Sequence, residues 1–362
     1  MSLRDKVLRM FPHAAEPGLI PIGSPGRSSP VLLSCNFTLT LHRLKRVLAG
    51  RNLWLLAADT HGINVWCAAG GGYLTHHQVI AAIRSTGIDR LVDHREVVLP
   101  QLAATGVEPR RVEAATGWRS RWGPARLEDL PAYLDRGRRA TRRERRMRFP
   151  LRERLEMASM WAVWTALIEG ALFTILGGWR VGIGVVVLTL LTVGGLFAAL
   201  PHLVVTGLRR WLTYAGAAVV GAAIGAAVTF TLGDASSRTF AFEAVASVVA
   251  MAVLAIDLAG TTPWYPSTIN TFRNFARIDL EAEKCTAAGD CVRVCPADVL
   301  RMDGQLRRVT IANPDACLQC GACIVQCPSD ALRFLYLDGR IIPPATIRST
   351  RVNMLGRRTI QM

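Results

Sequence analysis

The chain has few acidic and few aromatic residues. Asp and Glu number 27 against 43 Lys and Arg, which gives a formal net charge of +16, and Phe, Trp and Tyr make up 7% of the 362 residues. So basic a chain could bind nucleic acid, but no aromatic-rich recognition motif accompanies the charge, which disfavours that class. The opening residues are charged and lack the apolar run of a secretory signal peptide, so we expect none.

Apolar residues, by contrast, are abundant. They make up 51% of the chain, and the mean hydropathy of +0.26 is too high for a wholly soluble protein. The pattern predicts an α/β domain over residues 1–135, a transmembrane helical domain over 157–259 and an iron-sulfur domain over 280–336. The remaining segments are a basic juxtamembrane linker at 136–156, a second linker at 260–279 and a C-terminal tail at 337–362.

The central region divides into four apolar segments, at about 157–178, 181–206, 211–232 and 240–259. Each is long enough for a helix to cross the hydrocarbon core of a membrane, which takes about 20 residues. We therefore predict an all-α bundle of about four transmembrane helices.

Charge around these segments predicts their orientation. Ten arginines lie between Arg136 and Arg154, and Arg209 and Arg210 follow the second segment, whereas the loop before the fourth is nearly neutral. Positively charged flanks stay in the cytoplasm. We expect a multi-pass protein of the cytoplasmic (inner) membrane with both end domains in the cytoplasm.

Three residues within the apolar segments stand out. Gly221 and Gly225 form a small-xxx-small pair that lets helices approach closely. Glu169 is costly in lipid and should face protein or water. We expect a structural role for the bundle, which would anchor and orient the soluble domains.

Seven of the nine cysteines lie between residues 285 and 327. The run Cys317-x2-Cys320-x2-Cys323-x3-Cys327-Pro328 is typical of bacterial dicluster ferredoxins, in which the fourth cysteine binds the other cluster. In the first run alanine, at Ala288, stands where the second ligand is expected. One [4Fe-4S] cluster should therefore bind Cys295, Cys317, Cys320 and Cys323, and a second, [3Fe-4S] or [4Fe-4S] with an open iron, should bind Cys285, Cys291 and Cys327.

A zinc site and a set of disulfides are the alternatives to iron-sulfur clusters for these cysteines. Zinc ribbons use two separated Cys-x2-Cys pairs, and neither zinc nor disulfides explain the Cys-Pro that ends both runs. Thiolate clusters also imply a reducing compartment.

The N-terminal region alternates short apolar runs with helical stretches. Runs at 31–35 and 53–58, around Leu91 and at 97–99 are separated by helical patterns at 39–49 and 75–85. Such alternation predicts a Rossmann-like α/β domain with a parallel sheet, whose ligands bind beyond the carboxyl ends of the strands. The loop 59–63 would bring Cys67 to that edge.

Cys67 has the local chemistry of an activated thiol. Asn64 is a good helix N-cap, which places Cys67 at the third helical position, where backbone N–H groups favour thiolate. Gly70, Gly71 and Gly72 should end the helix after little more than a turn and allow a flat ligand to approach. Trp66 could pack against the neighbouring sheet or form one side of the site for that ligand. Cys35, in a plain apolar strand, is expected to be an ordinary buried cysteine.

The stretch from Asp59 to Gly70, Asp-Thr-His-Gly-Ile-Asn-Val-Trp-Cys-Ala-Ala-Gly, resembles the cap-helix signature of HgcA, the membrane corrinoid protein family of microbial mercury methylation. The cysteine tail resembles HgcB, its dicluster ferredoxin partner family, so the chain looks like a natural fusion of the two. The resemblance implies a cobalamin-type corrinoid whose cobalt is bound by Cys67. The cap-helix positions lining the corrin would be Asn64, Val65, Trp66, Ala68, Ala69 and Gly70.

The same resemblance implies an activity. The enzyme would transfer a methyl group from methyl-cobalamin to Hg(II), and the ferredoxin domain, fed by an electron donor, would reduce cobalt to Co(I). A folate-type protein would supply the methyl group. Three positions depart from the family pattern: Gly71 replaces a lysine, Ala288 replaces a cluster ligand, and no cysteine follows Cys327.

Alternatives therefore remain. One is a divergent fusion paralogue that methylates another acceptor, and another is a membrane-anchored ferredoxin electron carrier without corrinoid. Asp59-Thr-His61 is also close to the Asp-x-His-x-x-Gly motif of other corrinoid proteins, although Asn64 occupies the glycine position. We expect His61 to be a loop residue that does not bind cobalt, and His76 and His77 to be solvated or capping groups.

Overall fold

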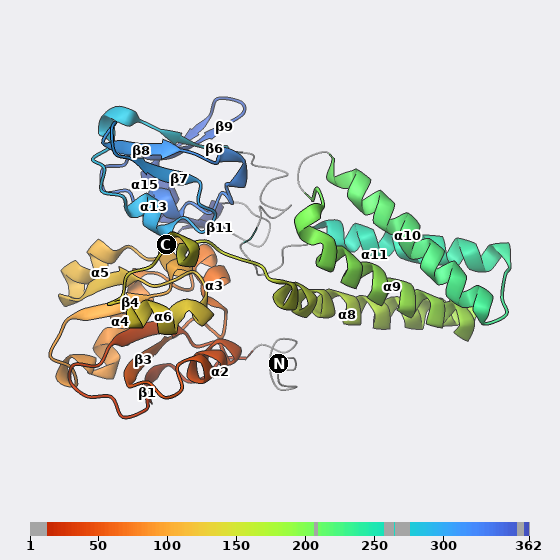
Figure 1. The fold of residues 1–362 in the computed structure, drawn as a ribbon, viewed down its shortest axis with the longest axis horizontal. Coiled ribbons are helices and arrows are strands. Elements are labelled where there is room, and N and C mark those ends of the chain that lie inside the picture. Colours follow the sequence, from red (N-terminus) through yellow and green to blue (C-terminus); the bar gives the residue numbers. More distant parts are fainter. Residues whose placement is uncertain (1–12, 206–208, 257–263, 265–275, 353–357, 362) are drawn as a thin grey trace. The chain divides into compact units, whose positions relative to one another are not determined.

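The computed structural model describes residues 13–205, 209–256, 264, 276–352 and 358–361 (Figure 1). The chain divides into two compact units, one that combines residues up to 148 with those from 276 onward, and one of helices from 149 to 256. The predicted linker at 260–279 and the last residues of the fourth apolar segment lie mostly outside the described residues. The predicted domain limits stay predictions.

The N-terminal part of the first unit is built on a five-stranded sheet. Its strands, in the spatial order β1-β3-β2-β4-β5, are parallel except for β1, which pairs antiparallel with β3. The predicted parallel sheet is therefore confirmed, with β2 and β3 at the predicted bounds. The strands are β1 (Gly18–Ile22), β2 (Val31–Cys35), β3 (Leu53–Ala58), β4 (Glu96–Leu99) and β5 (Arg119–Trp122).

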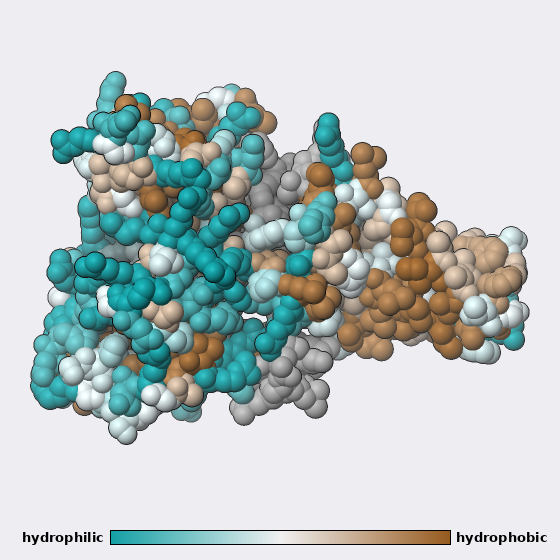
Figure 2. Space-filling model, in the orientation of Figure 1, coloured by the Kyte–Doolittle hydropathy of each residue, from teal (hydrophilic) through white to brown (hydrophobic). Residues whose placement is uncertain are grey.

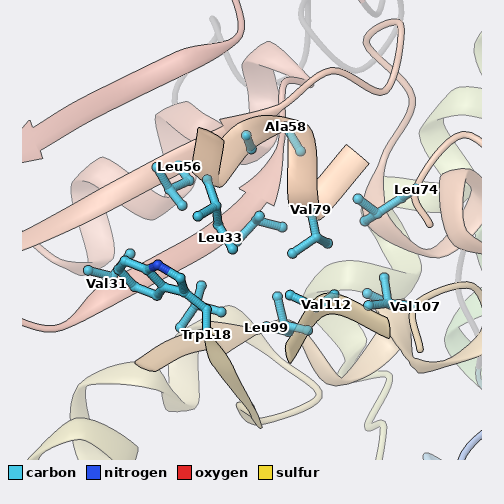
Figure 3. Packing of buried hydrophobic residues seen from close by; sticks show 14 of the residues in the cluster. Val31, Leu33, Leu56, Ala58, Leu74, Val79, Leu99, Val107, Val112 and Trp118 are labelled. Atoms are coloured by element: carbon cyan, nitrogen blue, oxygen red, sulfur yellow. The ribbon is translucent and has the colours of Figure 1, made fainter. Parts of the chain in front are cut away.

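Helices cover both faces of this sheet. Strand residues 31, 33, 56, 58, 97 and 99 pack against α3 (Val65–Gly71), α4 (His76–Thr86) and α5 (Pro109–Thr116), in the core drawn in Figure 3. The alternate strand residues pack against α2 (Thr38–Val47) and α6 (Leu130–Asp135). Both faces are buried, which explains the near-continuous apolar sequence of β2 and β3.

The sequence analysis placed one strand wrongly and missed both edge strands of the sheet, β1 and β5. The apolar run around Leu91 is not a strand: a 3-10 turn, Ile88–Arg90, precedes Leu91, which is 38% exposed. The edge strand β5 was not predicted, because its sequence Arg-Ser-Arg-Trp has little apolar character. An edge strand packs on fewer neighbours and so tolerates polar residues.

The topology creates a ligand-binding edge. From the central strand β2 the chain passes to β3 on one side and then to β4 on the other, so the strand order reverses beside β2. Crevices at such reversal points, beyond the carboxyl ends of the strands, are where open α/β sheets bind ligands. The loop after β3 leads directly to α3, which carries Cys67.

The second unit consists of four long helices. They are α8 (Leu151–Gly177), α9 (Trp179–Ala199), α10 (Arg210–Thr231) and α11 (Ser237–Ile256). Within the described residues, four helices are long and apolar enough to cross a membrane. Hydrophobic residues cover much of the face that Figure 2 shows for this unit.

Close helix packing inside this unit confirms the role expected of the two glycines. A Cβ atom would lie 2.3 Å from Ser247 Oγ at Gly221 and 2.2 Å from Glu243 Oε2 at Gly225, so a larger residue at either position would displace a neighbouring side chain. Glu169 is buried within protein and accepts a hydrogen bond from Thr189 Oγ1 (3.2 Å). Glu243, also buried, is a second carboxylate within the four long helices, and the sequence analysis did not single it out.

The C-terminal part of the first unit has the short strands and helices of a ferredoxin. β6 (Ala276–Leu280) and β10 (Ile341–Ile342) flank β9 (Leu332–Tyr336), and β7 (Leu300–Asp303) pairs with β8 (Arg308–Ile311). α13 (Asp290–Val294) and α14 (Ala322–Val325) follow the first cysteines of each run. α15 (Pro344–Ser349), β11 (Thr350–Val352) and β12 (Arg358–Gln361) complete it.

Candidate functional site

The loop between β3 and α3 is fixed by one buried amide. Asn36, which directly follows β2 and is 1% exposed, accepts hydrogen bonds through Oδ1 from Thr60 N (2.9 Å) and Gly62 N (3.0 Å). Its Nδ2 donates to Ala15 O (2.9 Å). Asn36 thus holds the entry to α3, a role that the sequence analysis missed because Asn36 lies far from that loop in sequence.

Gly62 is the tightest point of this loop. Its φ is 73°, and a Cβ atom there would lie 2.7 Å from Ala14 N. The left-handed conformation and the close backbone approach both require glycine. The path of the chain into α3 is therefore fixed twice, by the hydrogen bonds to Asn36 and by the close packing of Gly62.

Cys67 occupies the predicted place in α3. Asn64 is the N-cap, and its side chain accepts a hydrogen bond from Cys67 N (3.0 Å), which makes Cys67 the third helical residue. The helix ends at Gly72, whose φ is 88°. Positive potential at a helix N-terminus favours the thiolate form of such a cysteine.

The two faces of α3 differ in packing. Ala68 and Ala69 are fully buried, and Gly106 packs so closely below them that a Cβ atom would lie 2.7 Å from Ala69 O. Cys67 is partly exposed, and a Cβ at Gly70 would meet nothing within 4 Å. A flat macrocycle fits such a face, because no side chain at Gly70 would hold it away from the thiol. Of the other predicted corrin-lining residues, Asn64, Val65 and Trp66 are partly exposed, whereas Ala68 and Ala69 are the two buried residues.

The histidines divide differently from expectation. His61 and His77 are exposed, and the His61 ring lies against Tyr73 with centroids 5.6 Å apart. The expectation of a solvated or capping group is wrong for His76, which is 3% exposed, while Thr75 caps α4. Burial lowers the pKa of His76 to about 4, and its Nδ1 lies 3.7 Å from Glu108 Oε1.

Cys35 differs from Cys67 as expected. It is fully buried at the end of β2, and burial raises the pKa of its thiol. The structure therefore contains one buried cysteine and one partly exposed cysteine within the same α/β domain.

Burial raises the pKa of thiols in both cysteine runs. Burial and the neighbouring Cys327 and Cys285 raise the pKa of Cys291 to about 12. Burial raises the pKa of Cys323 well above its usual value, and Cys295, Cys320, Cys317 and Cys291 raise it further. The assignment of these thiols to two ligand sets stays a prediction. Within the described ranges, no three His, Cys, Asp or Glu side chains come close enough to hold a single metal ion.

The two cysteine runs have related backbone conformations. Gly289 and Gly321, each the N-cap of a short helix, have φ values of 73° and 77°, and the residues two places earlier, Ala287 and Gln319, also have positive φ. With the runs superposed in this way, Ala288 corresponds to Cys320. The methyl group of Ala288 thus stands where the other run presents a thiol.

A main contact between the ferredoxin part and the α/β part is made by the 3-10 helix η2 (Gln101–Thr105) and the two residues after it. Gln326 Nε2 donates to Ala104 O (2.8 Å) and Val107 O (2.7 Å), and the buried Arg351 donates to Gly106 O (3.3 Å). Gln101 Nε2 donates in return to Val294 O (3.2 Å). The same segment supports α3 through Gly106.

Two family models match parts of the chain. Residues 7–134 match the family described as CO dehydrogenase/acetyl-CoA synthase delta subunit, and residues 284–331 match the 4Fe-4S dicluster domain. Each match falls on a part of the chain that folds as the sequence predicts.

Curated relatives resemble the N-terminal part. The acetyl-CoA decarbonylase/synthase complex subunit gamma of Methanopyrus kandleri is 39% identical over 127 residues, which is 34% of this chain and 27% of that protein. The corresponding subunit of Methanocaldococcus jannaschii is 40% identical over 109 residues, 30% of this chain and 22% of that protein. The match spans about a quarter of the length of these relatives. The chain is therefore similar to these subunits in its α/β domain and to dicluster ferredoxins in its C-terminal domain.

Proposed function

We propose that this protein is a membrane-anchored corrinoid iron-sulfur methyltransferase, with Hg(II) or a related soft cation as the methyl acceptor. The observation that carries the proposal is the placement of Cys67, which stands third in a capped helix beside the open position of Gly70. The match of residues 7–134 to the acetyl-CoA synthase family supports it.

The residues present fit a corrinoid. Cys67 would hold the cobalt, and Trp66 and Gly70 would lie near the macrocycle. A bound corrinoid supplies a cobalt-held methyl group that leaves with its electron pair, as transfer to a metal cation requires. A thiolate donates electron density strongly and so favours that departure. Asn64 fixes the backbone of Cys67, which sets the direction of its sulfur.

The ferredoxin domain would pass electrons from its donor to this centre through iron-sulfur clusters held by its cysteines. Cys295, Cys317, Cys320 and Cys323 would hold one [4Fe-4S] cluster, and Cys285, Cys291 and Cys327 the incomplete one. Burial raises the pKa of several of these thiols, so iron must replace their protons when a cluster binds. Cys320 packs in a small cluster with Ala104 and Trp122 of the α/β part, which offers a short route for electrons.

Partners and location follow from the same proposal. The relatives are named as subunits of an acetyl-CoA decarbonylase/synthase complex, and we infer that a methyl-donor protein of folate type likewise docks on this α/β domain. A separate electron donor would reduce the ferredoxin domain. The four long helices would place the protein in the cytoplasmic membrane, with both end domains in the cytoplasm.

Anaerobic purification followed by metal analysis and a methylation assay tests the proposal. We expect cobalt equimolar with the chain, and methylmercury formed from Hg(II) by the methylated protein but not by Cys67→Ala. Iron and sulfide without cobalt would contradict it in favour of an electron carrier. If the protein contains cobalt but forms no methylmercury, corrinoid binding is supported and Hg(II) is not the methyl acceptor.

A further inference from the structure

A cavity of about 740 Å³ lies within the first unit, between the α/β and ferredoxin parts. One wall is formed by the carboxyl end of β5 and the first turn of α5, and the other by Cys327, a predicted cluster ligand, and residues that flank it. The volume is in the range of small-molecule sites. The cavity therefore lies at the edge of the sheet where such folds bind ligands, but apart from the residues assigned to cobalt.

The lining is strongly basic. Eight arginines and three carboxylates border the cavity, a formal excess of five positive charges. Arg110 and Arg111 come from α5, Arg139 and Arg145 from the arginine-rich segment after α6, and Arg348 from α15. This segment was predicted to be a basic juxtamembrane linker, and in the structure part of it faces this cavity.

The three carboxylates are already engaged. Asp290 pairs with Arg293 (2.5 Å), Asp330 pairs with Arg348 (2.6 Å), and Glu108 lies 3.4 Å from Arg111. They therefore cannot neutralise the remaining arginines of the cavity.

Three of those arginines keep uncompensated charge. Arg110 and Arg139 are exposed at the cavity and make no hydrogen bond or ion pair with another described residue. Arg145 donates to Ala140 O (3.2 Å) and pairs with no carboxylate in the described part of the chain. Guanidinium groups that line a cavity can bind phosphate and carboxylate oxygens in bidentate fashion.

We propose that this cavity binds a small polyanion, a molecule with two or more phosphate or carboxylate groups. The volume favours a molecule of nucleotide size over a polymer. Arg110 from α5 and Arg139 from the segment after α6 bind the anion, and Arg145 contributes a third positive charge. The proposal does not depend on corrinoid binding or on methyl transfer.

Calorimetric titration of the full chain in detergent with tripolyphosphate tests this site. We expect one saturable site per chain, weakened at least tenfold in the double variant Arg110→Gln/Arg139→Gln. The control, Arg90→Gln/Arg301→Gln, removes the same charge from exposed positions outside the lining and should change the affinity less than threefold.

A second titration with tricarballylate, a small tricarboxylate, separates the two anion classes. Tighter binding of either probe, with the same loss in the cavity variant, identifies the preferred group and supports the site. Absence of saturable binding by both probes, or equal weakening in the cavity and control variants, would overturn the proposal, because charge alone would then explain any affinity.

Discussion

Cys35 and Cys67 belong to one α/β domain, yet their surroundings differ in every respect that controls thiol chemistry. Cys35 ends a central strand, is fully buried, and has a raised pKa because of that burial. Cys67 stands near the N-terminus of a short helix, is partly exposed, and has its backbone N–H capped by Asn64. Since both residues are cysteines, their positions in the backbone should decide which of the two thiols can bind a metal.

Thiol alkylation should separate the two cysteines most strongly. In corrinoid-free protein, iodoacetamide should modify Cys67 at least roughly a thousandfold faster than Cys35, because Cys35 reacts only after local opening that costs about 4 kcal/mol or more. Peptide mass spectrometry over time measures both rates in one sample. Similar rates would mean that the two environments do not differ as described.

The support beneath α3 should be the next largest contribution. Gly106→Ala should lower stability by roughly 3 kcal/mol or more, because the new Cβ would lie 2.4 Å from Leu74 O and 2.7 Å from Ala69 O. Thermal unfolding followed by tryptophan fluorescence measures the loss. Gly26→Ala, with no atom within 4 Å of its Cβ, is the matched control. Equal effects of the two variants would show that α3 does not rest on Gly106.

Asn36 links the two cysteines, since it directly follows Cys35 and holds the loop that leads to Cys67. Asn36→Ala should cost about 2 to 3 kcal/mol, because two buried N–H groups lose their acceptor. It should also weaken corrinoid binding through the loosened loop. Asn52→Ala, which removes an exposed amide bonded to Ser24 N, should cost about 1 kcal/mol or less. If Asn36→Ala lowers stability no more than Asn52→Ala does, Asn36 does not anchor the loop between β3 and α3.

His76 should give the smallest effect, visible in the pH dependence of stability. Its pKa is about 4 in the folded protein, below the ordinary value of 6.5, so between these pH values the unfolded chain binds the extra proton. Stability should therefore fall as pH drops from 6.5 toward 4. His76→Phe should flatten this slope in melting temperature, whereas the exposed His77→Phe should leave it unchanged. Parallel slopes for all three proteins would contradict the burial of a neutral His76.

The sequence predicted those features that depend on local patterns. The N-cap at Asn64, the helix position of Cys67 and the bounds of β2 and β3 each follow from residues close together in the chain. The dicluster spacing was informative because cluster geometry restricts where thiols can stand.

Other features depend on segments that meet only after folding. Asn36 is one polar residue after a strand, and its importance appears only when the loop after β3 packs on it. Burial of His76 depends on Glu108 and the ferredoxin part, and Arg139 and Arg145 face a cavity that the α/β part cannot form alone. No local pattern carries such information, because each depends on the tertiary arrangement.

The visible absorption spectrum of the full chain loaded with cobalamin tests the central claim most directly. The account predicts a spectrum altered by sulfur ligation in the wild-type protein and in Cys35→Ala, and its loss in Cys67→Ala. An unchanged spectrum in Cys67→Ala, in protein that still binds cobalamin, would contradict cobalt ligation by Cys67.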